Sequence, residues 1–159
     1  MREALFSTLG ADVADAAVLD LYAGSGALGI EALSRGAASA VFVESDRRAA
    51  AVVERNLSAL GLKAAVHRTT ARRYCSEPSG GPFDIVLCDP PYATPLSEVV
   101  DRVTDLRSAG ALAPDALVVI ERDRRDPDLG AQTPHWLASH GARTYGDTVL
   151  LYFEASEEQ

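Results

Sequence analysis

The sequence predicts a single α/β domain built on a mostly parallel sheet. Short apolar runs alternate with amphipathic stretches along the 159 residues, and these runs are nearly continuous rather than interrupted by polar residues. Such strands are typical of parallel sheets that helices cover on both faces. The length suits one hydrophobic core, and no repeat or linker interrupts the pattern, so we expect residues 1–159 to form one domain.

Seven strands are expected, at residues 17–22, 40–44, 64–67, 83–88, 116–121, 143–145 and 149–154. Helices are expected at residues 28–34, 46–60, 71–75 and 96–106, with a last helix ending over residues 136–140. The last two strands flank the turn sequence Gly146-Asp147 and therefore form an antiparallel hairpin. In folds of this class ligands bind beyond the carboxyl ends of the strands, so residues that follow a strand are the first candidates for function.

Composition and charge exclude several classes of protein. No apolar run is long enough to span a membrane, and the first residues are too polar for a secretion signal, so we expect a cytoplasmic protein. We also expect it to act as a monomer. Cys75 and Cys88 are expected to be buried thiols, and no Cys/His group has zinc-ligand spacing, so we expect no metal. The formal net charge of −8 argues against a free-standing RNA-binding protein, which usually carries a basic surface.

A glycine-rich turn follows the first expected strand. Gly24, Gly26 and Gly29 have the spacing GxGxxG, and Glu44 ends the next strand, 20 residues after Gly24. This pattern is typical of nucleotide sites in which the acid holds ribose hydroxyls, although a turn without a ligand shares it. Asp20 would repel a pyrophosphate but suits the ammonium and sulfonium groups of S-adenosylmethionine. We therefore favour S-adenosylmethionine over NAD, and the alternative for Asp20 is a carboxylate that only caps the turn.

The fourth expected strand ends in Asp89-Pro90-Pro91-Tyr92. Two prolines turn the chain out of the sheet and contribute no N–H groups, so the segment offers the Asp89 carboxylate and backbone carbonyls as acceptors. Such acceptors suit the exocyclic amine of a nucleic-acid base, because they hold its hydrogens and favour attack of its lone pair on a positioned methyl group. Tyr92 is expected to stack on the base. A proline turn whose aromatic ring packs on the core is the alternative.

These segments together resemble a known family. The stretches that resemble Rossmann-like class I methyltransferases acting on amino groups are Asp20 to Glu31, Val43 to Asp46 and Asp89 to Tyr92. A narrower resemblance to the RsmD family of 16S rRNA guanine-N2 methyltransferases rests on Arg2 to Phe6, Leu33 to Ala37, Asn56 and Tyr145 to Thr148. The resemblance implies S-adenosylmethionine as the cofactor and 16S rRNA, within the small ribosomal subunit, as the partner.

The resemblance also implies roles for individual residues. The guanine would be received by the catalytic segment Asp89, Pro90, Pro91 and Tyr92. The residues implied to bind S-adenosylmethionine are Asp20, Tyr22, Ala23, Gly24, Ser25, Gly26, Gly29, Glu44, Ser45, Thr70, Ala71 and Asp89. Thr70 and Ala71 are included because the acid that many methyltransferases place after the third strand is absent from Arg68-Thr69-Thr70-Ala71. Family members usually carry a basic segment before the Arg-Glu-x-Leu-Phe helix, and we expect that arm to be missing here.

Several questions about the substrate stay open at the level of sequence. The arginines expected at the carboxyl edge, where they contact RNA phosphates or lie in solvent, are Arg72, Arg73, Arg122, Arg124 and Arg125. Because the chain is acidic, we favour an assembled small subunit over protein-free rRNA. The alternative functions are methylation of adenine N6 in DNA, methylation of protein glutamine, an NAD-dependent oxidoreductase, and a non-catalytic RNA-binding module for ribosome assembly.

Overall fold

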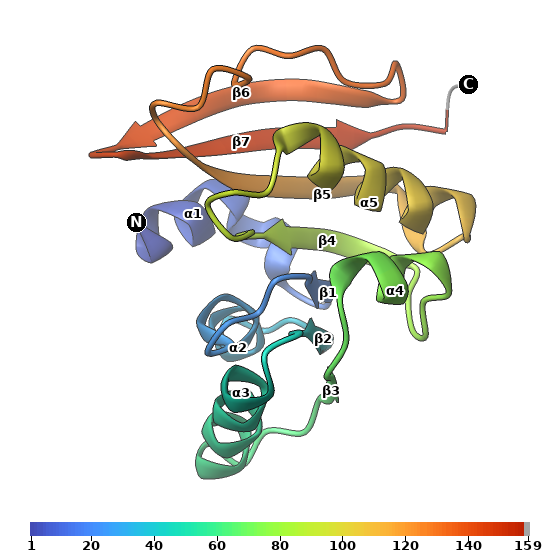
Figure 1. Cartoon of the computed structure of the whole chain (residues 1–159). Helices are drawn as coiled ribbons and strands as arrows, with labels where there is room; N and C mark the ends of the chain where they lie inside the picture. Colours follow the sequence, from blue (N-terminus) through green and yellow to red (C-terminus); the bar gives the residue numbers. More distant parts are fainter. Residues whose placement is uncertain (158–159) are drawn as a thin grey trace.

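The computed structural model describes residues 1–157 and contains one seven-stranded sheet (Figure 1). The strands are β1 (Ala17–Asp20), β2 (Ser39–Val43), β3 (Ala65–His67), β4 (Phe83–Cys88), β5 (Leu112–Asp123), β6 (Leu137–Tyr145) and β7 (Thr148–Ala155). Their order in the sheet is β3-β2-β1-β4-β5-β7-β6. The first five strands pair in parallel, and β7 pairs antiparallel with both β5 and β6. The predicted mostly parallel sheet with an antiparallel C-terminal hairpin is confirmed.

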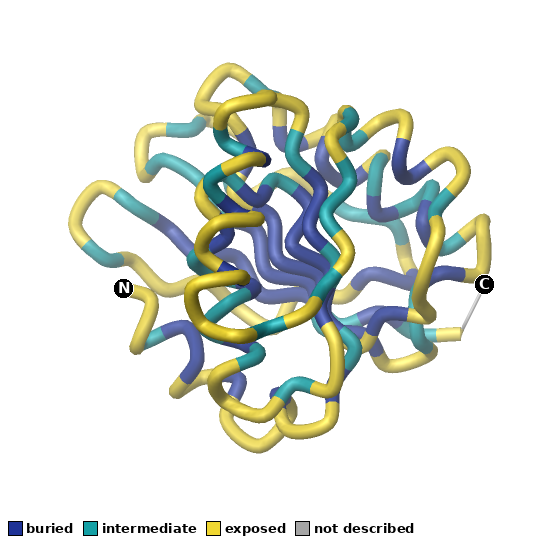
Figure 2. Tube along the Cα trace, turned by 90° about the horizontal axis from the view of Figure 1, so that it is seen from below, coloured by how far each residue is buried: buried dark blue, intermediate teal, exposed yellow. Residues whose placement is uncertain are grey.

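Helices cover both faces of this sheet. They are α1 (Arg2–Leu9), the 3-10 helix η1 (Gly10–Val13), α2 (Ala27–Ser34), α3 (Arg47–Ala59), α4 (Ala71–Ser76) and α5 (Leu96–Ser108). Buried side chains form two clusters, one beneath α1, α2 and α3 and the other beneath α4 and α5. Successive strand residues point to opposite faces, so Val18 joins the first cluster and Leu19 the second. The central strands are therefore buried on both sides (Figure 2), which explains their continuous apolar runs.

N-cap residues mark the start of two helices next to the site, α3 and α4. Asp46 precedes α3, and its carboxylate accepts a hydrogen bond from the Ala49 N–H at 2.9 Å. Thr70 precedes α4, and its hydroxyl accepts from the Arg73 N–H at 3.1 Å. Both are N-caps, which satisfy backbone donors that the helix itself leaves unpaired. The caps fix where the chain leaves β2 and β3, at the carboxyl edge of the sheet.

The helix predicted to end over residues 136–140 is wrong, because residues 137–145 form the edge strand β6. This strand pairs with β7 from Leu137 opposite Ala155 to Tyr145 opposite Thr148, with an irregularity between residues 139 and 142. Most of its side chains are exposed, so the segment lacks the alternating apolar pattern of a half-buried strand. Backbone pairing with β7, a long-range interaction, decides its conformation.

The described residues show neither a membrane span nor a metal cluster. Within residues 1–157 no helix combines the length and apolar character that crossing a membrane requires. In the same range no three His, Cys, Asp or Glu side chains are grouped as metal ligands would be. Cys75 and Cys88 are buried free thiols, as predicted.

Candidate active site

The three glycines of the turn between β1 and α2 serve different purposes. Gly24 and Gly26 adopt positive φ angles of 58° and 84°, which side chains with a Cβ rarely tolerate. Gly29 lies inside α2, where a Cβ would come within 2.4 Å of the Phe42 ring. The first two glycines therefore shape the turn, and the third lets α2 pack closely on β2.

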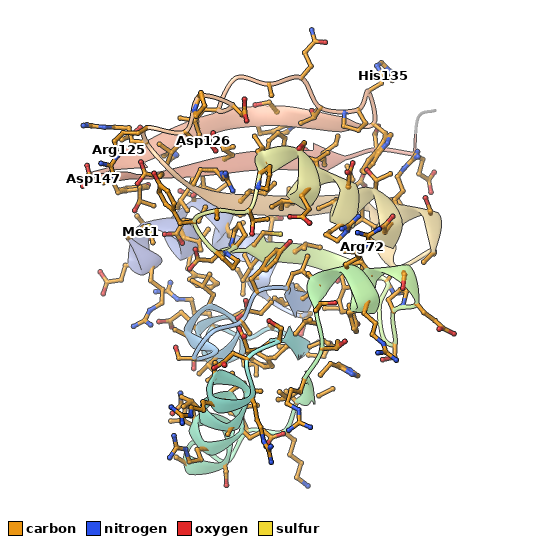
Figure 3. The ribbon with its side chains drawn as sticks, viewed as in Figure 1. Met1, Arg72, Arg125, Asp126, His135 and Asp147 are labelled. Carbon is orange, nitrogen blue, oxygen red and sulfur yellow. The ribbon has the colours of Figure 1, made fainter. Side chains whose placement is uncertain are left out.

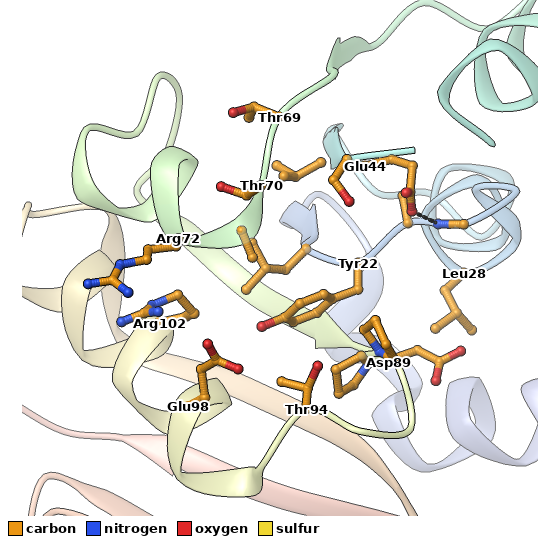
Figure 4. A pocket seen from close by; sticks show the side chains of 18 of the residues that line it. Tyr22, Leu28, Glu44, Thr69, Thr70, Arg72, Asp89, Thr94, Glu98 and Arg102 are labelled. Atoms are coloured by element: carbon orange, nitrogen blue, oxygen red, sulfur yellow. Dashed lines mark hydrogen bonds between the residues drawn. The ribbon is translucent and has the colours of Figure 1, made fainter. Parts of the chain in front are cut away.

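Glu44 joins the end of β2 to the glycine turn. Its Oε1 accepts a hydrogen bond from the Gly24 N–H at 2.8 Å, drawn as a dashed line in Figure 4. Its Oε2 accepts from the Asp46 N–H at 2.7 Å, and the Asn56 side chain braces the turn by donating to the Ser25 carbonyl at 3.0 Å. Each carboxylate oxygen has a further lone pair, so Glu44 retains the capacity to accept from ligand hydroxyls.

A cavity of about 700 Å³ opens beyond the carboxyl ends of β1, β2 and β4. Its volume lies in the range of small-molecule and cofactor sites. The predicted cofactor residues that line it are Tyr22, Ala23, Gly24, Ser25, Glu44, Ser45, Thr70, Ala71 and Asp89. Asp20, Gly26 and Gly29 do not belong to its lining. Nine of the predicted residues are thus brought together around one space, and three support it from behind.

Side chains from α5, which sequence reasoning missed, also line this cavity. Glu98 and Arg102 stand one helical turn apart and face Arg72 at one end of the space, while Asp89 lies at the other end (Figure 4). An acid and a base at this spacing occur on many exposed helix faces, so the sequence carried no signal for them. Arg72, predicted to contact RNA or lie in solvent, is exposed and also lines the cavity.

Asp20 is a buried carboxylate behind the glycine turn, with only 1% of its surface exposed. Its Oδ2 accepts from the Gly29 N–H at 3.0 Å, and its Oδ1 has no hydrogen-bond partner among the described residues. Burial raises the pKa of Asp20 to about 7; the Gly29 bond opposes this rise, and the charges of Asp89 and Glu44 add to it. A cation in the adjoining cavity would offset the repulsion among the carboxylates of Asp20, Asp89 and Glu44. The group of carboxylates therefore fits a positively charged ligand.

A second cavity, of about 410 Å³, lies on the other side of Asp89 and Pro90, which line both spaces. Tyr92 lines only the second cavity and is 76% exposed, so its ring does not pack on the core. Pro91 lines only the first. The remaining walls come from the end of β5 and from the β6–β7 turn, where Figure 3 shows Arg125, Asp126 and Asp147 together. The Asp89–Tyr92 segment is therefore the partition between two neighbouring cavities.

Arg122 holds this partition in place. Its Nη1 donates to the Thr94 carbonyl at 2.8 Å, and its Nε donates to Asp126 at 2.7 Å. The side chains of Arg122 and Asp126 are only 8% and 9% exposed. The prediction that Arg122 contacts RNA phosphate or lies in solvent is therefore wrong, because its guanidinium is committed to internal partners.

Glu121, which the sequence did not single out, is hydrogen-bonded to Asp89 through the two carboxyl groups. Burial, together with the charge of Asp89 and their shared hydrogen bond, raises the pKa of Glu121 to about 7. Burial also raises the pKa of Asp89, against the opposing effect of the hydrogen bond from Glu121. The partition thus carries a carboxyl pair rather than one isolated carboxylate.

Comparisons with known proteins agree with this arrangement. Residues 1–154 match the family model described as Conserved hypothetical protein 95. The chain is 40% identical over 124 residues to Ribosomal RNA small subunit methyltransferase D of Escherichia coli (strain K12), covering 77% of this chain and 61% of that protein. It is 35% identical over 157 residues to the Putative rRNA methyltransferase YlbH of Bacillus subtilis, covering 96% of this chain and 83% of that protein.

Solved structures show the same fold. The Putative methyltransferase yhhF from Escherichia coli superposes with a TM-score of 0.88 at 33% identity, covering 99% of this chain and 86% of that one. The putative methylase HI0767 from Haemophilus influenzae superposes with a TM-score of 0.82 at 31% identity, covering 98% and 96%. The sheet described above is therefore that of a class I methyltransferase.

Proposed function

The chain belongs to the family described as Conserved hypothetical protein 95, and from this premise we propose that it methylates the N2 amine of a guanine in 16S rRNA of the small ribosomal subunit. The methyl donor in this proposal is S-adenosylmethionine. The relative named Ribosomal RNA small subunit methyltransferase D supports the class of substrate. The observation that carries the proposal is the shared wall: Asp89 and Pro90 line both cavities, so a donor in one and a base in the other meet at the same segment.

The larger cavity is the proposed place of S-adenosylmethionine, which supplies an activated methyl group on a sulfonium when bound. Glu44 would hold the ribose hydroxyls, and the start of α4 at Thr70 and Ala71 would contact the adenine. Asp20 would act from behind the turn, since its buried carboxylate, whose Oδ1 has no partner among the described residues, favours positive charge in the cavity.

The smaller cavity is the proposed place of the guanine. Asp89 would accept a hydrogen of the N2 amine, and the two prolines would leave that acceptor without competition from backbone N–H groups. The exposed ring of Tyr92 would stack on the base. In this proposal the chain contributes mainly position and electrostatics, because the methyl group arrives already activated.

The sheet disfavours an NAD-dependent oxidoreductase. An antiparallel β7 lies between β5 and β6, whereas the dinucleotide-binding fold continues there with parallel strands. A carboxylate behind the glycine turn would also oppose a pyrophosphate at that helix N-terminus.

The test is transfer of a labelled methyl group from S-adenosylmethionine to small ribosomal subunits from a strain that lacks this protein. Nucleoside analysis should then find labelled N2-methylguanosine. Asp89→Ala should abolish transfer and leave binding of S-adenosylmethionine within a few-fold of wild type, because Asp89 forms only one edge of that cavity. Asp115→Ala is the matched control, since this exposed acid lies at the start of β5, away from both cavities.

Either of two results would contradict the proposal. Label in a different nucleoside would show that the acceptor is wrong. Loss of cofactor binding in a folded Asp89→Ala protein would show that Asp89 belongs to the donor site instead. Equal transfer to protein-free rRNA and to small subunits would contradict our preference for the assembled particle.

A further inference from the structure

Glu121 emerges beside Asp89 from the neighbouring strand. Strands β4 and β5 are parallel, and their register places Cys88 opposite Ile120. The next residue along each chain is Asp89 on one and Glu121 on the other, so both side chains point to the same face of the sheet. Their carboxyl groups are hydrogen-bonded to each other, and both residues line the smaller cavity.

Glu121 is half-buried and Asp89 is exposed, and two carboxyl groups in contact do not ionise independently. Burial raises the pKa of both carboxyl groups, and the charge of Asp89 and their hydrogen bond help to raise that of Glu121 to about 7, so the pair takes up one proton more readily than two separate carboxyl groups would. With that proton held between the carboxyl groups, each retains an oxygen that accepts hydrogen bonds. The pair therefore presents two adjacent acceptors to an occupant of the smaller cavity.

Guanine carries two adjacent donors on the edge that contains the methylated atom, the N2 amine and the N1–H. We propose that Glu121 is a specificity-determining residue for the acceptor base, accepting the N1–H of guanine while Asp89 accepts a hydrogen of the N2 amine. This inference rests on the proposed function, because it takes guanine N2 as the methylated atom.

The same pair disfavours bases that carry a lone pair beside their amine. Adenine presents N1 without a hydrogen next to its N6 amine, and 2-aminopurine presents N1 without a hydrogen next to the same N2 amine that guanine has. In both adenine and 2-aminopurine, the lone pair on N1 would face an acceptor oxygen of Glu121, and that oxygen would be left without a hydrogen-bond donor. A site built around a hydrogen bond selects against such analogues by about tenfold to a hundredfold for one bond of this kind.

The test compares guanine with 2-aminopurine at one position. Small subunits are reconstituted with rRNA carrying either base at the nucleotide that the wild-type protein labels, and kcat/KM of methyl transfer is measured for each. The wild-type protein should prefer guanine by about tenfold or more. Glu121→Ala should lose most of this preference, because guanine transfer slows while 2-aminopurine transfer stays near the wild-type value.

Glu121→Gln serves as the conservative variant. Its amide oxygen accepts the N1–H, and its NH2 group donates to Asp89 in place of the shared proton, so it should keep most of the preference for guanine. Asp115→Ala should show the wild-type ratio. Thermal unfolding and binding of S-adenosylmethionine are measured for every variant, so a fold defect is distinguished from a change in base selection.

The outcomes separate this inference from the proposed function. An unchanged preference in a folded, cofactor-binding Glu121→Ala protein would overturn the role of Glu121 and leave the proposed function standing. Absence of transfer to guanine by the wild-type protein would overturn the proposed function itself. If Glu121→Ala does not fold, Glu121→Leu, which keeps the bulk and removes the acceptor, decides: a lost preference for guanine supports the inference, and a retained preference in a folded protein overturns it.

Discussion

Replacing Gly29 with alanine is expected to push α2 away from β2 and to destabilise the fold. The new Cβ would lie 2.4 Å from Cε1 and 2.7 Å from Cζ of Phe42, a fully buried ring, and 3.2 Å from Cβ of Asp20. Overpacking of this kind costs about 1–3 kcal/mol, and a contact this short belongs at the upper end. Alanine gains about 1 kcal/mol over glycine in a helix, so the net loss should be about 1–2 kcal/mol.

The assay is thermal unfolding of Gly29→Ala beside a matched glycine variant. For a domain of this size the expected loss corresponds to a fall in Tm of about 2–8 °C. Gly130→Ala is the control, because its φ lies outside the left-handed region and no atom lies within 4 Å of its Cβ. This variant should be as stable as wild type, or more stable by about 0.4–1 kcal/mol.

A second substitution tests the cause. Phe42→Leu removes ring atoms that the new Cβ would strike, so it should cost less in the Gly29→Ala background than in wild type, with a coupling of about 0.5 kcal/mol or more. If Gly29→Ala proves as stable as Gly130→Ala, or if the two substitutions are additive, then close packing of α2 on β2 is not the reason for this glycine.

Three further predictions concern the two cavities. Arg122→Met should lower the free energy of unfolding by about 1–3 kcal/mol in urea titrations, because Asp126, only 9% exposed, keeps the Asp128 N–H but loses its charged partner. Arg125→Met, at a side chain that is 72% exposed, should change it by less than about 0.5 kcal/mol; similar losses in both variants would contradict the role given to Arg122 in holding the Asp89–Tyr92 segment. Binding of S-adenosylmethionine near pH 7 should release protons and tighten as pH rises, because a cation lowers the pKa of Asp20 from about 7. Calorimetry in two buffers of different ionisation enthalpy measures the number of protons released. Fewer protons should be released when the Asp20→Asn variant binds S-adenosylmethionine, or when the wild-type protein binds S-adenosylhomocysteine, whose sulfur is uncharged. Tyr92→Ala should leave Tm unchanged, since the ring is exposed, and should raise the KM for small subunits about tenfold through lost stacking; Tyr92→Phe should behave as wild type, and a change in Tm without a change in KM would place the ring in the core.

The sequence was sufficient for most of the order of elements, apart from the helix expected before residue 140, and for two of the motifs. Continuous apolar runs encode buried parallel strands, so β1 to β4 were predicted close to their observed bounds, whereas β5 extends beyond the predicted residues 116–121 at both ends. The glycine turn and the Asp89–Tyr92 segment were also predictable, because backbone φ requirements and missing N–H groups are properties of the residues themselves. Of the edge strand β6 only residues 143–145 were predicted, because the exposed side chains before them carry no such pattern.

What the tertiary structure alone decided is which distant residues share a cavity. Glu98 and Arg102 reach the larger space only because α5 packs across that face, and Glu121 meets Asp89 only because β4 and β5 pair in one register. The sequence by itself determined the chemistry at each strand end, since local propensities and turn residues act over a few positions. Strand register and helix packing join positions more than thirty residues apart, so the carboxyl pair exists only in the folded chain.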